Sequence, residues 1–237
     1  MTDLLTYQLS DGVATIVMDD GKANVMSAEM ISQLDAAFAR ARSDRAVVVL
    51  TGRGNIFSAG YDLAVFDQPQ AVVAETMRAG GDLIQRILGH PHPTVAACNG
   101  HAIAQGAFTL LACDHRIGAD GPFKVGLNEV AIGLTIPHYG IELARHQLAS
   151  TWFDHATVTA KLYSPAEAER AGFFHELVAP GDVLARATEA ARALGTLDPT
   201  AHEGTKQRSR RAVLSAMATL HSAEFAASSS ATGERGQ

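Results

Sequence analysis

Glu129 is the only acid in the apolar segment VGLNEVAIGL, which covers residues 125–134. A carboxylate with apolar neighbours has a raised pKa, because a low-dielectric environment penalises its charged form. A carboxyl group tuned toward neutral pH is suited to removing a proton from carbon and returning it. An exposed glutamate in a surface loop fits the segment equally well, so other groups must decide between the two interpretations.

Two turns precede Glu129 and could supply hydrogen-bond donors for the same chemistry. The first, NIFSAGYDL at 55–63, has the pattern of a strand that ends in Ser-Ala-Gly and continues into a helix, which leaves backbone N–H groups unpaired. A plain strand-to-helix connection is the alternative. The second, AIAQGAFTLLACD at 102–114, is rich in small residues that allow close approach to a helix N-terminus. An N–H of Gln105 or Gly106 facing one near Ala59 would form an oxyanion hole for an enolate.

Motifs and composition exclude several classes of function. The second turn lacks the Gly-Lys-Ser/Thr of a P-loop, and no G-x-G-x-x-G dinucleotide fingerprint is present. A net charge of −6 over 237 residues leaves no dominant basic field for coating nucleic acid. No export signal is visible, and no apolar run reaches the roughly 20 residues that span a membrane. Cys98 and Cys113 are too few for a disulfide framework or a cysteine zinc site, so we expect buried thiols, no metal and a cytoplasmic location.

Alternating strands and helices are predicted to position the two turns. Residues 4–9 and 13–19 form two strands around an Asp-Gly turn, and Ser27 is placed to cap a helix whose apolar positions recur at helical spacing. The later expected elements follow the same alternation: strands 45–52 and 94–100, helix 104–113, strand 115–119, helical segments from about 137 that include one capped by Ser164, strand 175–180 and helix 181–195. This order predicts an α/β fold.

The chain is expected to divide into a core, a helical region and a tail. No Pro/Ser-rich linker interrupts 1–195, which we assign to one core domain, followed by one or two amphipathic helices at 196–226 and a disordered tail at 227–237. The helical region carries a basic cluster, for which a solvated helix face and a phosphate contact both stay open: Lys206, Arg208, Arg210 and Arg211.

Four ordered motifs resemble the crotonase superfamily, also called the enoyl-CoA hydratase/isomerase family. They are KANVMS, FSAGYDL, NGHAIAQGAFTLLACDHRIG and GLNEVAIGLTIP, and the resemblance covers most of 1–195. It implies a spiral of ββα units, a helical C-terminal trimerisation region and an acyl-CoA thioester substrate from fatty acid metabolism. Coenzyme A would be part of that substrate rather than a cofactor. The implied assembly is a homotrimer or a dimer of trimers, with the basic cluster near a CoA phosphate.

The resemblance also implies roles for individual residues. The oxyanion donors would be the backbone N–H groups of Ala59 and Gln105, where the family usually has Gly at the second position. Further substrate contacts fall on the motif positions Lys22, Ala23, Val25, Ser58, Gly60, Tyr61, Asp62, Leu63, Gly106, Phe108 and Ile136.

One departure from the family pattern favours a particular reaction. Hydratases of this family use two glutamates; the first maps onto Phe108 and the second onto Glu129. One carboxylate suffices to move a proton from C2 to C4 of a 3-enoyl thioester, as Δ3,Δ2-enoyl-CoA isomerases do. A hydratase with a second polar group from His101, Tyr139 or Asp62, and an acyl-CoA binder without turnover, are the alternatives.

Several polar residues near the motifs have structural interpretations. Asp62 is placed to cap the helix after residue 61. Tyr61 could line an acyl pocket or pack in the core. Asp114 and Arg116 are expected to form a structural pair across a strand.

Overall fold

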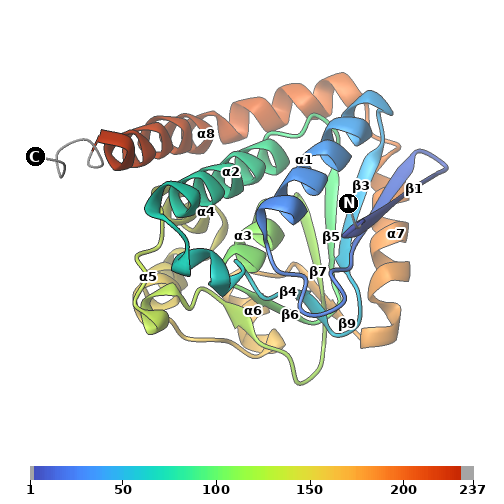
Figure 1. Cartoon of the computed structure of the whole chain (residues 1–237). Coiled ribbons are helices and arrows are strands. Elements are labelled where there is room, and N and C mark those ends of the chain that lie inside the picture. The colour runs from blue at the N-terminus through green and yellow to red at the C-terminus, as the bar shows by residue number, and fades with distance from the viewer. Residues whose placement is uncertain (1–2, 231–237) are drawn as a thin grey trace, which may run out of the picture.

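The computed structural model describes the backbone of residues 3–230 and the side chains of residues 3–221, 223 and 224. Two sheets organise the fold (Figure 1). The larger has six strands in the order β1-β2-β3-β5-β7-β9, and the smaller has three in the order β4-β6-β8. The strands are β1 (Leu5–Ser10), β2 (Val13–Met18), β3 (Val47–Gly52), β4 (Ile56–Ser58), β5 (Thr94–Cys98), β6 (His101–Ile103), β7 (His115–Ala119), β8 (Val125–Gly126) and β9 (Glu176–Val178).

The chain alternates between the two sheets as it winds. The pairs β3/β4, β5/β6 and β7/β8 each place their first strand in the larger sheet and their second in the smaller one. An α-helix follows each pair of strands: α2, α3 and α4. Among the described strands, β1 and β2 pair in antiparallel fashion, and the other strand pairs are parallel. The predicted spiral of ββα units is therefore confirmed.

Helices cover both faces of the larger sheet. On one face lies the main apolar core, to which α1, α2, α3 and α4 contribute, and on the other α7 packs over a smaller core. The helices are α1 (Ala28–Ser43), α2 (Gln70–Leu88), α3 (Gln105–Leu111), α4 (His138–Gln147), α5 (Ser150–Val158), α6 (Pro165–Ala171), α7 (Val183–Leu194) and α8 (Pro199–Ser230), with short 3₁₀ turns η1 (Leu63–Asp67), η2 (Glu129–Ile132) and η3 (Pro180–Asp182).

Local sequence signals behave as expected at several element ends. Asp11 and Gly12 adopt φ values of +51° and +75°, which match the right-handed twist of the β1–β2 hairpin. The Ser27 side chain accepts the Met30 N–H at 3.2 Å and so caps α1. Ser164 begins α6 with a capping box. Cys98 and Cys113 are both buried free thiols.

Three features differ from the expectations. Helix α2 lacks a counterpart among the predicted elements, and the predicted strand 94–100 ends at Cys98 as β5, with β6 beyond it at His101–Ile103. The C-terminal region is a single 32-residue helix, α8, which continues through residues 227–230 of the predicted tail. Residues 231–237 lie outside the described part of the chain.

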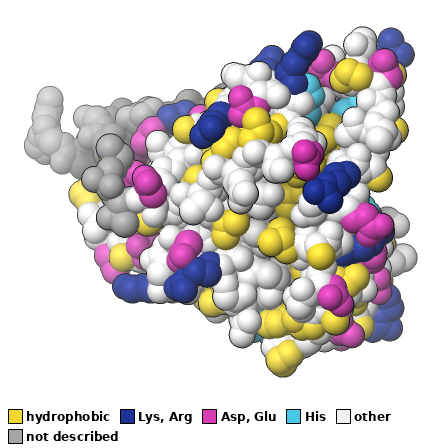
Figure 2. Space-filling model, turned by 90° about the vertical axis from the view of Figure 1, so that its right-hand side faces the viewer, with side chains coloured by type: hydrophobic (Ala, Val, Ile, Leu, Met, Phe, Trp, Pro, Cys, Tyr) yellow, Lys and Arg dark blue, Asp and Glu magenta, His cyan; other side chains and the backbone are white. Residues whose placement is uncertain are grey.

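Helix α8 runs along α2 and α4 (Figure 1). Val213 and Met217 on α8 are buried in the main core, so part of its apolar face packs against its own chain. On the face seen in Figure 2, Lys and Arg side chains are interspersed with Asp and Glu, and no broad field of one sign is present. Among the described residues, no helix is long and apolar enough to cross a membrane.

Candidate functional site

Glu129 lines an apolar cavity of about 140 Å³. The walls come from the turns that follow β4 and β6, from η1, α2, α3 and α4, and from the segment between β8 and α4. The lining residues are Ala59, Tyr61, Leu63, Phe66, Met77, Ala104, Phe108, Asn128, Glu129, Ile132, Leu134, Thr135, Pro137 and Tyr139. Glu129 is the only carboxylic acid among them. The cavity therefore combines one titratable acid with an apolar wall.

Burial tunes the Glu129 carboxyl group. Its residue is only 6% exposed, and its Oε2 atom has no hydrogen-bond partner among the described residues. Burial raises the pKa of Glu129 to about 7, because the charged form loses its hydration. The buried interpretation of Glu129 is confirmed, and the exposed-loop alternative is wrong.

The two small-residue turns lie directly against each other. Gly60 has φ +91°, and a Cβ added there would lie 3.0 Å from the Ala104 Cβ and 3.4 Å from the Gln105 nitrogen. A Cβ at Gly106 would lie 2.4 Å from the Ser58 carbonyl oxygen. Glycine is required at both positions because only a bare backbone permits this approach. The first turn and the N-terminus of α3 therefore share one wall of the cavity.

Hydrogen bonds decide which backbone donors remain available. The Ala59 N–H donates to the Ala23 carbonyl oxygen at 3.0 Å, and the Gly60 N–H lies 3.2 Å from Ser58 Oγ. The next N–H groups at this contact, those of Tyr61 and Gln105, have no hydrogen-bond partner among the described residues. The prediction for the Ala59 N–H is contradicted, because that donor is already used inside the protein. Tyr61 replaces it as the available donor on the first turn.

The loop with the predicted contacts Lys22, Ala23 and Val25 is held beside the first turn. The Asp20 carboxylate accepts the N–H groups of Lys22, Asn24 and Val25 at 2.7–2.8 Å. Burial alone would raise the pKa of Asp20, but these backbone donors lower it below its ordinary value. The loop in turn accepts the Ala59 N–H through Ala23. One carboxylate thus fixes the loop that supports the turn.

The predicted contact residues divide into two groups. Ala59, Tyr61, Leu63 and Phe108 line the cavity beside Glu129. The others do not line it, and they are Lys22, Ala23, Val25, Ser58, Gly60, Asp62, Gln105, Gly106 and Ile136.

The candidates for a second polar catalytic group have other contacts. The Asp62 side chain accepts the Ala64 N–H at 3.0 Å and caps η1, as predicted. His101 Nδ1 accepts the Lys124 N–H at 3.1 Å, and its ring packs on Phe123, away from the lining residues. Tyr139 does line the cavity. Sequence reasoning missed Phe66 and Met77, since it gave no role to η1 or α2.

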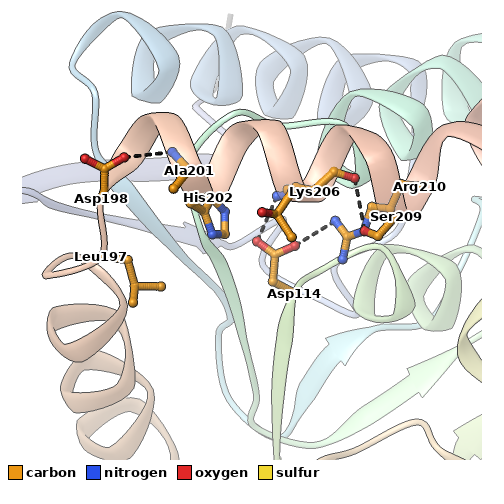
Figure 3. Close-up of a pocket in the computed structure, with 9 residues that line it drawn as sticks. Asp114, Leu197, Asp198, Ala201, His202, Lys206, Ser209 and Arg210 are labelled. Carbon is orange, nitrogen blue, oxygen red and sulfur yellow. Dashed lines mark hydrogen bonds and ion pairs between the residues drawn. The ribbon is translucent and has the colours of Figure 1, made fainter.

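Two members of the basic cluster point toward Asp114 (Figure 3). Lys206 Nζ lies 2.8 Å from Asp114 Oδ2, and an Arg210 guanidinium nitrogen lies 2.7 Å from Asp114 Oδ1. Lys206 is 7% exposed, so a solvated helix face is wrong for it. The expected Asp114–Arg116 pair is also wrong, because the Arg116 guanidinium donates to the carbonyl groups of residues 113, 172 and 173. Arg208 and Arg211 are exposed.

No group of three or more His, Cys, Asp or Glu side chains among the described residues could hold a metal ion. The polar side chains among the lining residues are the Glu129 carboxyl group, the Asn128 amide and the hydroxyl groups of Tyr61, Thr135 and Tyr139, and the unpaired N–H groups of Tyr61 and Gln105 lie at the contact between the two turns.

Comparisons with known proteins point to acyl-CoA chemistry. The profile of the family described as enoyl-CoA hydratase/isomerase matches residues 8–234. A putative enoyl-CoA hydratase of Thermus thermophilus is 34% identical over 82% of this chain and 79% of its own. The human mitochondrial enoyl-CoA delta isomerase 1 is 28% identical over 90% of this chain and 72% of its own. A Mycobacterium tuberculosis protein has two solved structures, one described as an enoyl-CoA isomerase and the other as a probable enoyl-CoA hydratase. They are 39% and 38% identical to this chain, cover 96% and 97% of it and 99% of their own chains, and superpose with a TM-score of 0.91.

Proposed function

The chain belongs to the enoyl-CoA hydratase/isomerase family and is an acyl-CoA enzyme, and from that premise we propose that it shifts the double bond of a 3-enoyl-CoA to give a 2-enoyl-CoA. The names of its relatives divide between hydratase and isomerase. The observation that carries the proposal is the cavity itself, where Glu129 is the only carboxyl group among the described lining residues. Phe108, onto which the resemblance maps the first hydratase glutamate, lines the same cavity.

The proposed reaction uses Glu129 as both base and acid. Its carboxylate removes a proton from C2 of the 3-enoyl thioester, and the electron pair of that C–H bond delocalises into a dienolate. The N–H groups of Tyr61 and Gln105 donate to the thioester oxygen as negative charge develops on it. The protonated Glu129 then returns the proton to C4, which leaves the double bond between C2 and C3. No atom is gained or lost.

A pKa near neutrality suits Glu129 to both halves of this cycle. With a pKa of about 7, the carboxyl group is ionised in a large fraction of molecules at neutral pH and can act as the base. After it has taken the proton, the same carboxyl group is an acid of suitable strength to return it. A carboxylate at its ordinary pKa would be a weaker base toward carbon.

The apolar wall disfavours hydration. Adding water across a double bond requires a positioned water and proton exchange at two centres, which two glutamates supply in hydratases of this family. Phe108 is 1% exposed and its ring packs against Tyr139, with ring centroids 5.9 Å apart. This side chain excludes water from one side of the cavity and offers no proton.

A spectral assay with two substrates tests the proposal. Conversion of 3-hexenoyl-CoA creates a conjugated thioester and raises its ultraviolet absorbance, whereas hydration of crotonyl-CoA removes that absorbance. We expect the protein to isomerise 3-hexenoyl-CoA and to hydrate crotonyl-CoA at least about tenfold more slowly, because one acid/base group is missing. Efficient hydration without isomerisation would overturn the isomerase proposal and favour the hydratase. Binding of both thioesters without turnover would favour a non-catalytic binder.

The remaining expectations extend the same proposal. The loop at Lys22, Ala23 and Val25 is proposed to contact the CoA moiety, since it adjoins the turn that carries the Tyr61 N–H. A homotrimer or dimer of trimers and a cytoplasmic location stay predictions. Light scattering of the intact protein tests the assembly. A direct contact of Lys206 or Arg210 with a CoA phosphate has lost support, because Asp114 already pairs with both charges.

A further inference from the structure

The Tyr139 hydroxyl group lies at the centre of a chain of side-chain hydrogen bonds at the wall of the cavity. Tyr139 is the second residue of α4 and is fully buried. Its hydroxyl lies 2.8 Å from Gln105 Oε1 and 3.0 Å from the Tyr61 hydroxyl. It therefore contacts the side chains of both residues whose backbone N–H groups are available at the cavity wall.

The direction of each hydrogen bond follows from the groups involved. Gln105 Nε2 donates to the Gly80 carbonyl oxygen at 3.1 Å, which fixes the amide so that Oε1 faces Tyr139. Tyr139 donates its single proton to that Oε1, so the contact with Tyr61 uses the Tyr61 proton. The Tyr61 hydroxyl also lies 3.4 Å from the Met77 carbonyl oxygen, a longer second contact. Burial raises the pKa of both tyrosines, so both keep their protons at neutral pH.

The neighbouring helix α2 is shaped to admit this chain. A Cβ at Gly80 would lie 1.9 Å from the Tyr61 hydroxyl oxygen and 3.1 Å from Gln105 Nε2. A Cβ at Gly81 would lie 2.8 Å from the Tyr139 ring. Two adjacent glycines weaken the interior of a helix, and any larger side chain at position 80 would displace Tyr61. The hydrogen-bond chain thus links α2, α3, α4 and the turn after β4.

We propose that Tyr139 is a positioning residue that holds the Tyr61 and Gln105 backbone N–H groups in register with each other. It acts through the side chains of those two residues and does not itself donate to the thioester oxygen. The inference rests on the proposed function, because it concerns the same pair of donors. The proposal also gives the Gln105 side chain a role. A backbone N–H donor by itself would not require a glutamine at this position.

Replacement of Tyr139 by Phe tests the inference, since it removes the hydroxyl and keeps the ring that packs on Phe108. We expect kcat for 3-hexenoyl-CoA to fall about 10- to 100-fold, less than or comparable to the loss of a whole oxyanion donor. KM should stay within about threefold, because ground-state binding is not changed. Bound 2,4-hexadienoyl-CoA should show a smaller shift of its absorbance to longer wavelength, because its carbonyl is less polarised.

Tyr163→Phe is the matched control. Tyr163 is also fully buried, and its hydroxyl lies 2.7 Å from His155 Nδ1, outside the cavity lining. The control should keep the wild-type kcat and spectral shift even if it lowers the melting temperature. A fall of kcat in Tyr139→Phe that leaves the full spectral shift, or an equal fall in the control, would overturn the inference and indicate a packing role.

A second variant keeps the test decisive if Tyr139→Phe does not fold. Gln105→Met removes the acceptor of the Tyr139 proton and retains the backbone N–H. It should reproduce the fall of kcat and the smaller spectral shift, and in a foldable double variant the two losses should not add, because they break one network. Wild-type kcat and spectral shift in Gln105→Met would refute the inference. Failure of the proposed function gives a different result, since the wild-type protein itself would then not isomerise 3-hexenoyl-CoA.

Discussion

Two buried carboxyl groups, Glu129 and Asp114, meet opposite electrostatic surroundings in this fold. Glu129 faces the apolar cavity, where burial raises its pKa to about 7. Burial also acts to raise the pKa of Asp114, but the charges of Lys206 and Arg210, together with hydrogen bonds from Lys206 and Thr94, lower it below its ordinary value. Both acids follow apolar stretches in the sequence, yet one can exchange a proton near neutral pH and the other cannot.

Under the proposed mechanism, the difference separates a reactive acid from a structural one. A buried charge with two cationic partners keeps α8 attached to the start of β7 (Figure 3). A buried acid without such partners is costly to ionise, and that cost is useful only where a proton is to be moved. The same chemical change, acid to amide, should therefore have different consequences at the two positions.

Glu129→Gln is expected to have the largest effect, on turnover. The amide keeps the shape of the side chain but cannot accept the C2 proton, so kcat should fall by about 10²–10⁴-fold while acyl-CoA affinity stays within a few-fold. Steady-state kinetics with 3-hexenoyl-CoA and calorimetric titration with a saturated acyl-CoA measure the two quantities. Glu75→Gln, at an exposed ion pair on α2, is the control and should keep wild-type kcat. Activity of Glu129→Gln within tenfold of wild type would contradict the assignment.

Asp114→Asn is expected to have its effect on stability instead. It leaves Lys206 and Arg210 without a counter-charge at nearly buried sites, so the free energy of unfolding should fall by about 3–5 kcal/mol. The kcat of the folded fraction should not change. The control is Asp35→Asn, which breaks an exposed pair with Arg86 and should cost less than about 1 kcal/mol. Urea denaturation of both variants measures the two losses. Equal losses in both variants would mean that burial does not strengthen the Asp114 cluster.

The pH dependence of stability should have opposite signs at the two acids. The folded-state pKa of Glu129 is raised from 4.5 to about 7, so its contribution is fully present below pH 4.5 and is lost as the pH rises to 7. Glu129→Gln should therefore become more stable than wild type by up to about 3 kcal/mol at pH 8, with little difference near pH 4.5. The contribution of Asp114 is present above its ordinary value of 3.8 and is lost as the pH falls through its lower folded-state pKa. Urea denaturation of wild type and both variants from about pH 2.5 to pH 8 covers both windows and checks both signs. A Glu129→Gln variant less stable than wild type at pH 8 would contradict the raised pKa.

Short-range signals in the sequence were sufficient for much of this fold. The Asp11-Gly12 hairpin, the Ser27 and Ser164 caps and the strand–helix alternation act through neighbouring residues, so they could be read without a structure. The isolation of Glu129 among apolar residues was readable for the same reason. The family resemblance supplied the spiral that periodicity alone could not.

What the sequence could not show depends on partners distant along the chain. The Ala59 N–H is used by Ala23, 36 positions earlier, and that bond exists only once Asp20 has shaped its loop. Asp114 pairs with Lys206 and Arg210 across more than 90 residues rather than with nearby Arg116. Helix α2 escaped prediction because Gly80 and Gly81 interrupt its interior. A Cβ at these positions would collide with the side chains of Tyr61 and Tyr139, which are distant in the sequence.

The smallest expected effect concerns backbone strain beside the cavity. Ala104 has φ +50° and ψ −122°, a conformation that favours glycine, and it precedes the Gln105 N–H. Such strain costs roughly 1–3 kcal/mol, and the greater freedom of glycine in the unfolded chain offsets about 0.4–1 kcal/mol of any relief. Ala104→Gly should therefore raise the free energy of unfolding by about 1 kcal/mol. Because the added freedom lies next to a proposed donor, kcat should fall a few-fold.

Ala160, with φ +53°, lies outside the cavity lining, so Ala160→Gly is a control in which kcat should stay at the wild-type value. Urea denaturation and kinetics on the two variants separate strain that serves the site from strain that serves only the fold. Unchanged kcat in both variants would show that Ala104 has no part in holding the donor.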